Sequence, residues 1–171
     1  MTKQALSPGH LLAVDVGLRT GLAMFAEPAQ LLWYRSHHLG DPAKLKKMVG
    51  RLLREPPRPT HLFLEGGGRL AEVWKREAGS LAIAVHQVQA EAWRQRLFYR
   101  RQQGRRALAK QEAGKLARQV ITACGGKKPT SLRHDAAEAI LTGFYGLLEL
   151  GWIDSWPDGS QIGSSVPEAL R

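Results

Sequence analysis

Acidic residues stand at the boundaries of three hydrophobic segments, and this placement limits how the chain can fold. Asp15 ends the apolar run LLAVD, Glu65 ends the run HLFLE, and Asp135 and Glu138 open the segment HDAAEAILTGFYGLLEL. A carboxylate at the end of a buried strand is costly unless it has a partner. We therefore expect the fold to gather these carboxylates around a divalent cation, because hard oxygen ligands suit Mg²⁺ or Mn²⁺.

The charge balance indicates the class of substrate. Lys and Arg number 25 against 15 Asp and Glu, which gives a formal net charge of +10. Such an excess attracts polyanions and steers association with nucleic acid. An arginine-rich background composition is the alternative explanation of the charge. A metal site together with a basic surface favours a nuclease.

Length and composition limit the number of domains, the disulfide content and the expected location of the protein. With 171 residues we expect one domain over residues 1–152, followed by a partly disordered tail over residues 153–171. The single cysteine, Cys124, excludes an intramolecular disulfide and a four-cysteine zinc site, and is expected to be a small buried hydrophobe. No segment approaches the roughly 20 apolar residues of a membrane helix. The expected location is the cytoplasm, or the host cytoplasm if the gene is viral.

The hydrophobic pattern predicts strands and helices in a mixed order. Strands are expected at residues 11–15, 22–27, 30–37, 61–65 and 80–88. Helices are expected at residues 43–55, 69–77, from 91 onward, at 107–124, and after Ser131 as a helix N-cap. Short turns join the first three strands into an antiparallel meander. The fold class predicted is α/β, with a mixed five-stranded sheet flanked by helices.

The acidic pair on the last helix is suited to two-metal phosphodiester hydrolysis. That chemistry needs carboxylates that hold two cations a few ångströms apart, and Asp15 is placed to bridge them. Asp135 and Glu138 are separated by three residues, and His134 and Glu138 by four, so they share one helix face. Asp135 alone is also explained by the helix dipole, and Asp15 alone by a strand-end cap. The occurrence of all these acidic residues in one chain is what predicts a shared metal site.

The motifs LLAVDVGLRTGLAMF, HLFLEGGG and RHDAAEAILTGFYGL, in this order, resemble the RuvC-like Holliday junction resolvases of the RNase H-like superfamily. The resemblance implies an RNase H-like fold, Mg²⁺ or Mn²⁺ as cofactor with two ions per site, paired nicks in four-way DNA junctions, and a homodimer. It also implies the site residues, which are Asp15, Glu65, Asp135 and Glu138 as catalytic metal ligands, His134 as a substitute ligand, and Lys110 as a catalytic lysine.

Two departures from RuvC itself concern the region after Glu65. Gly67 and Gly68 stand where RuvC carries an aromatic residue, and the following helix is expected to be short, over residues 69–77. This form resembles the viral and plastid branches of the family. We expect the dimer interface near the Glu65 strand and this helix, with Trp74 as its buried anchor. The alternative is that Trp74 packs into its own core.

A basic segment and a basic loop are the predicted DNA contacts. Arginine side chains match phosphate oxygens, and neighbouring aromatic residues can stack on bases. Phe98 and Tyr99 are candidates for stacking or wedging, although Phe98 is also explained as a core residue. The predicted DNA-binding residues are Arg94, Arg96, Arg100, Arg101, Arg105, Arg106, Lys110, Lys127 and Lys128.

Three other functions compete with a junction resolvase. A related RNase H-like nuclease would cut an RNA precursor or another branched DNA. A junction-binding protein without catalysis would need no complete set of acidic residues, whereas none of the expected acidic positions here is neutral. An actin-like sugar kinase also begins with an Asp-x-Gly strand, but it needs two lobes, which 171 residues cannot supply.

Overall fold

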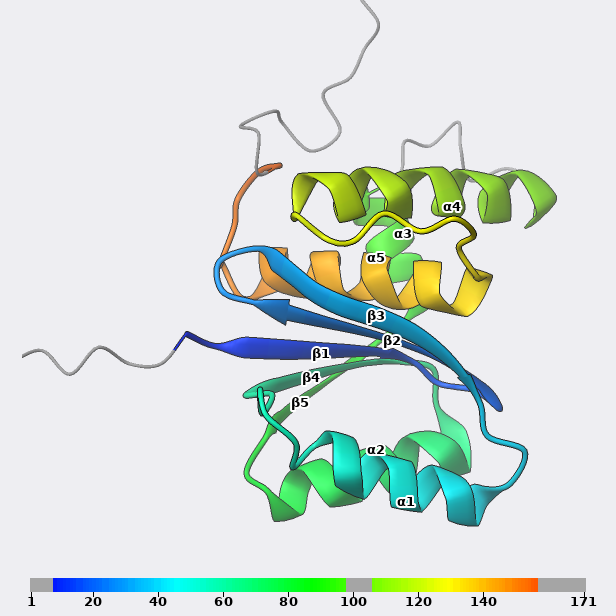
Figure 1. The fold of residues 1–171 in the computed structure, drawn as a ribbon, viewed down its shortest axis with the longest axis vertical. Helices are drawn as coiled ribbons and strands as arrows, with labels where there is room; N and C mark the ends of the chain where they lie inside the picture. The colour runs from blue at the N-terminus through cyan, green and yellow to red at the C-terminus, as the bar shows by residue number, and fades with distance from the viewer. Residues whose placement is uncertain (1–7, 98–105, 157–171) are drawn as a thin grey trace, which may run out of the picture.

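The computed structural model describes residues 8–97 and 106–156, which form a sheet between two layers of helices (Figure 1). The strands are β1 (His10–Asp15), β2 (Arg19–Ala26), β3 (Gln30–His38), β4 (His61–Glu65) and β5 (Ala84–Val88). The helices are α1 (Pro42–Leu52), α2 (Gly68–Ser80), α3 (Ala90–Leu97), α4 (Arg106–Ala123) and α5 (His134–Glu149).

The strands form one mixed sheet in the order β3-β2-β1-β4-β5. β1, β2 and β3 are an antiparallel meander, whereas β4 runs parallel to β1 and β5 runs parallel to β4. The predicted α/β class and mixed five-stranded sheet are therefore confirmed. In the parallel pair Asp15 lies opposite Glu65, so both carboxylates leave the sheet at the same end.

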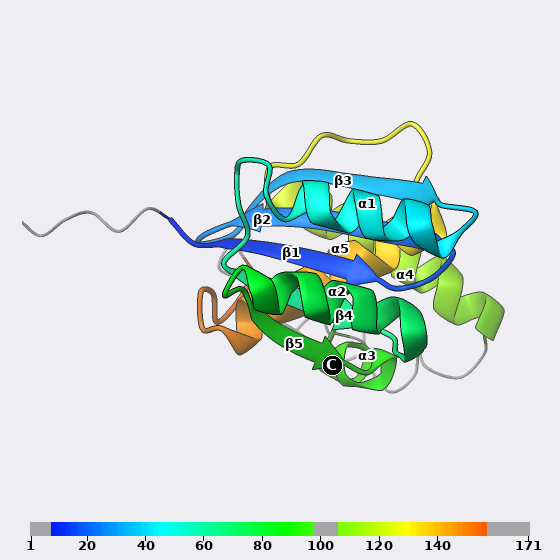
Figure 2. The ribbon, with the colours of Figure 1, turned by 90° about the horizontal axis from the view of Figure 1, so that it is seen from below.

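Alternation along the strands decides which face receives the acidic side chains. Leu12 and Val14 belong to the hydrophobic core under α1 and α2, which lie side by side on one face (Figure 2). Leu11 and Ala13 belong to the core on the other face, which α5 covers and on which α4 is the outer layer (Figure 1). Successive side chains of a strand point to opposite faces, so Asp15 lies on the α5 side.

Small residues allow α5 to approach the sheet closely. A Cβ atom added to Gly146 would lie 2.7 Å from Leu11 Cδ1. One added to Gly21, which pairs with Asp15 across β1 and β2, would collide with the backbone carbonyl of Asp135. The first turns of α5 therefore rest directly on the sheet beside the end of β1. This contact brings Glu138 to the carboxylates of the strands.

Several element boundaries differ from the prediction. Ser131 is not the N-cap of α5, because the helix begins at His134 after Arg133, which makes no capping hydrogen bond through its side chain. Helix α2 begins one residue earlier than predicted, at Gly68, whose φ is positive at 74°, and ends three residues later, at Ser80. The longer α2 shortens β5, because the backbone N–H of Ile83 still bonds to the carbonyl of Ala78.

Two buried residues test predictions about single side chains. Trp74 is fully buried between α2 and the sheet, so the prediction that it anchors a dimer interface is wrong, and the alternative of core packing is confirmed. Trp74 belongs to the same hydrophobic core as Leu62 and Leu64 of β4. Cys124 is buried as predicted, and burial raises the pKa of its thiol to about 12.

The end of the described chain packs against the domain. Ile153 and Trp156 contact the core around α5, and Trp156 stacks on Phe144 with 4.7 Å between ring centroids. The prediction of a partly disordered tail extends to residues 157–171, which lie outside the described residues. Across residues 8–97 and 106–156, no helix combines the length and the apolar character needed to cross a lipid bilayer.

Candidate functional site

Three carboxylates from distant parts of the chain meet at one end of the sheet. Asp15 ends β1, Glu65 ends β4, and Glu138 lies in the second turn of α5. One oxygen from each can be chosen so that all three lie within 4.8 Å of one another. The predicted proximity of Asp15 and Glu65 on adjacent strands is confirmed. Three hard oxygen donors at this spacing fit a divalent cation of the Mg²⁺ or Mn²⁺ type.

Burial and mutual repulsion raise the pKa values of two of these carboxyl groups. Burial raises the pKa of the Asp15 carboxyl to about 8, and the negative charges of Glu138, Glu65 and Asp135 add to the increase. Burial and Glu138 also raise the pKa of Glu65. Carboxylates this close favour protonation of one of their number unless a cation compensates the charge. A bound divalent cation would restore the ionised forms.

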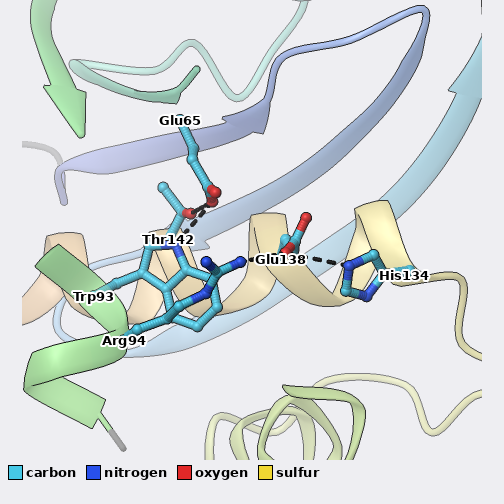
Figure 3. A network of polar contacts seen from close by, with 6 residues as sticks. All are labelled: Glu65, Trp93, Arg94, His134, Glu138 and Thr142. Atoms are coloured by element: carbon cyan, nitrogen blue, oxygen red, sulfur yellow. Dashed lines mark hydrogen bonds and ion pairs between the residues drawn. The ribbon is translucent and has the colours of Figure 1, made fainter. Parts of the chain in front are cut away.

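Glu65 is held by two neutral donors. The indole Nε1 of Trp93 in α3 donates to Glu65 Oε2 at 2.8 Å, and the hydroxyl of Thr142 in α5 donates to the same oxygen at 2.9 Å (Figure 3). Trp93 and Thr142 are fully buried, and Glu65 is 7% exposed. Sequence reasoning missed both partners. The signal for Thr142 was its place one turn after Glu138, in an otherwise apolar helix face.

Glu138 has charged or ionisable partners instead. Arg94 Nη2 and His134 Nε2 each lie 3.2 Å from Glu138 Oε1, on opposite sides of it (Figure 3). The side chains of Arg94 and His134 are 38% and 39% exposed, so water reaches both contacts. Arg94 also lies over the ring of Trp93, 5.1 Å from its centroid. Adjacent residues of α3 thus reach two different carboxylates of the site.

Asp135 lies beside the group of three rather than within it. Its Oδ2 accepts a hydrogen bond from the hydroxyl of Ser36 on β3, a contact that sequence reasoning missed. Its charge still contributes to the raised pKa of Asp15. His134, the alternative ligand at this helix start, contacts Glu138. The structure thus places both candidates at the site, and their roles as metal ligands stay predictions.

Four of the predicted DNA-binding residues have exposed side chains in the described part of the chain. Arg96 on α3, Lys110 on α4, and Lys127 and Lys128 in the loop before α5 are exposed. The Tyr34 hydroxyl donates to the carbonyl of Lys127 at 2.6 Å, which ties this loop to β3. Within the described part of the chain no hydrogen bond or ion pair joins Lys110 to the three carboxylates, whose ion pairs are those of Glu138 with Arg94 and His134.

Other predicted DNA contacts cannot be placed. Arg106 is the first residue of α4, and its side chain is not described. Outside the described residues lie Phe98, Tyr99, Arg100, Arg101 and Arg105. Their roles stay predictions.

Comparison with known proteins identifies the fold. No protein-family model and no curated protein sequence matches the chain. Among solved structures, RuvC of Thermus thermophilus matches with a TM-score of 0.61 and 17% identity, covering 83% of this chain and 96% of that one. The chain has the RNase H-like fold of RuvC. The structure of T. thermophilus RuvC in complex with a Holliday junction substrate matches with a TM-score of 0.60 and 17% identity, over 84% and 96% of the two chains.

Proposed function

We propose that this protein is a metal-dependent endonuclease that cuts four-way (Holliday) DNA junctions by paired nicks. The observation that carries the proposal is the convergence of Asp15, Glu65 and Glu138 at one sheet end, in a fold similar to RuvC. A solved structure of that similar protein contains a Holliday junction substrate. The net charge of +10 fits a polyanionic partner.

We propose that Asp15, Glu65 and Glu138 hold Mg²⁺ or Mn²⁺, with two ions per site, and that Asp135 and His134 are further ligands at its edge. When bound, the cations would activate a water molecule and stabilise the leaving oxygen of the phosphodiester. Asp15 would hold a cation together with Glu65 and Glu138, because one oxygen from each of the three lies within 4.8 Å of the others. Burial of Glu65 keeps bulk water away from one side of the group.

Basic residues are the proposed contacts for the DNA backbone. Arg94 stands at the site itself, whereas Arg96, Lys127 and Lys128 are exposed farther out. Lys110 is proposed to approach the scissile phosphate and to stabilise charge that develops there. Phosphate contacts position DNA without reading its sequence. The proposed set also includes Arg100, Arg101, Arg105 and Arg106.

Paired nicks require two active sites, and we propose a homodimer that presents them symmetrically to the junction. The outer side of α2 is the proposed contact, since Arg69, Glu72 and Arg76 are exposed there while Trp74 is not. We also propose that the chain is nearer to the viral and plastid resolvases than to RuvC itself, because Gly67 and Gly68 follow Glu65.

The proposal is tested by incubating the protein with a labelled four-way junction, a matched duplex, a single strand and an RNA precursor, with and without Mg²⁺. We expect Mg²⁺-dependent cleavage of the junction and not of the duplex. In Asp15→Asn cleavage should be lost, while junction binding persists or tightens because a negative charge has been removed. Preferential cleavage of the RNA, or junction binding without cleavage under any metal condition, would contradict the proposal.

A further inference from the structure

We propose that Trp93 and Thr142 are positioning residues, which fix the Glu65 carboxylate through one oxygen and leave the other oxygen for a divalent cation. The inference rests on the proposed function, because it assigns how this chain prepares one ligand of the proposed metal site. Neither residue lies within the group of carboxylates, so each acts through Glu65 rather than on substrate.

Both donors converge on Glu65 Oε2, from two helices that are separate in the sequence. A carboxylate oxygen has two lone-pair sites, and an indole N–H and a hydroxyl fill them. Among the described residues, no hydrogen bond engages Oε1. Two donors from fixed helices determine where the carboxylate lies and how it is rotated. The available oxygen is therefore held in one orientation before any ion arrives.

The donors are suited to a metal ligand because they are neutral. Trp93 and Thr142 stabilise the negative charge of Glu65 without adding a cation that a metal ion would have to displace. Both side chains are fully buried, so water does not compete with them for Glu65 Oε2. Partners of this kind, which orient a ligand without touching the metal, change metal affinity by about 10-fold to 100-fold when they are removed.

The chain supplies a matched control for the tryptophan. Trp74 and Trp93 are both fully buried, on opposite faces of the same sheet. The Nε1 of Trp74 has no hydrogen-bond partner among the described residues, whereas that of Trp93 bonds to Glu65. Replacement of either by phenylalanine removes the same atoms from a packed core. Only the replacement at position 93 removes a hydrogen bond to the carboxylate.

The experiment titrates Mn²⁺ into the DNA-free protein and measures affinity by calorimetry or by the electron paramagnetic resonance of free Mn²⁺. We expect Thr142→Val and Trp93→Phe each to weaken Mn²⁺ binding by about 10-fold. Thr142→Ser, which keeps the hydroxyl, should restore most of the affinity. Trp74→Phe should bind Mn²⁺ as the wild type does. Saturating Mn²⁺ should return junction cleavage by Thr142→Val toward the wild-type rate.

Several outcomes would overturn the inference. Equal Mn²⁺ affinity of Thr142→Val and Thr142→Ser would show that the hydroxyl at position 142 is irrelevant. If Trp93→Phe does not fold, the comparison of these two Thr142 variants alone tests the inference. Equal losses in Trp93→Phe and Trp74→Phe would assign the effect to packing. If the wild type bound Mn²⁺ no better than Asp15→Asn, the proposed metal site itself would fail. In the first two outcomes the wild type still binds Mn²⁺, so failure of this inference can be distinguished from failure of the proposed metal site.

Discussion

Glu65 and Glu138 belong to one group of carboxylates, yet their surroundings differ in kind. Glu65 ends a central strand and accepts hydrogen bonds from two fully buried neutral donors. Glu138 lies on a helix and contacts Arg94 and His134, each more than a third exposed. Exposed ion pairs contribute about 0–1 kcal/mol, whereas a buried donor left without its partner costs about 1–3 kcal/mol. The comparison shows one carboxylate held by buried neutral donors and one whose charged partners are partly open to water.

The largest expected effect is the pH dependence of folding stability, because the negative charges of both glutamates raise the pKa of Asp15. Its folded-state pKa is raised from the ordinary value of 3.8 to about 8, so the folded state binds more protons than the unfolded state between these values. Stability of the metal-free protein should therefore fall as pH rises from about 4 to 8. Thermal unfolding in EDTA at several pH values measures this decrease, and Asp15→Asn should reduce it.

The same measurement sharpens the comparison between the two glutamates. The charge of Glu138 raises the pKa of Asp15 more than that of Glu65 does. Glu138→Gln should therefore flatten the pH dependence more than Glu65→Gln. The opposite order would mean that the strand-end carboxylate dominates the field at Asp15.

The next effect concerns stability near pH 5 without metal. Glu65→Ala leaves Trp93 Nε1 and Thr142 Oγ1 without their buried acceptor, and we expect a loss of about 1–3 kcal/mol. Glu138→Ala removes only partly exposed contacts, and its cost should stay within about 1 kcal/mol. Urea unfolding in EDTA compares the two variants. Equal losses of unfolding free energy would contradict the distinction between a carboxylate held by buried donors and one with partly exposed partners.

The smallest expected effect concerns the competition between Arg94 and metal for Glu138. Arg94→Ala removes a cation from the carboxylate, so Mn²⁺ affinity of the DNA-free protein should rise, by no more than about 5-fold because the Arg94 side chain is partly exposed to water. Calorimetric titration measures the change, with Arg96→Ala as the matched control, since Arg96 is exposed on the same helix. A fall in affinity specific to Arg94→Ala would show that the guanidinium supports the ligand instead.

The sequence predicts the sheet and the meeting of Asp15 with Glu65, because strand alternation and strand ends are local signals. It does not predict the bond between Trp93 and Glu65, since residues 28 positions apart meet only through the placement of α3. The contact of Ser36 with Asp135 spans 99 positions and depends on how α5 crosses β3. The start of α2 was misplaced because Gly68 disfavours a helix by propensity, while burial of Ala71, Trp74 and Ala78 favours it.

The close approach at Gly21 has a consequence for how this site can change over evolution. Because any side chain at position 21 would collide with the backbone of Asp135, a single methyl group there would act as a spacer between the sheet and the start of α5. Such a spacer would move Glu138 away from Asp15 while leaving every acidic residue in place. A descendant could thus separate the three carboxylates without losing any of them, and an intact set of acidic residues in the sequence would then no longer indicate an intact cluster.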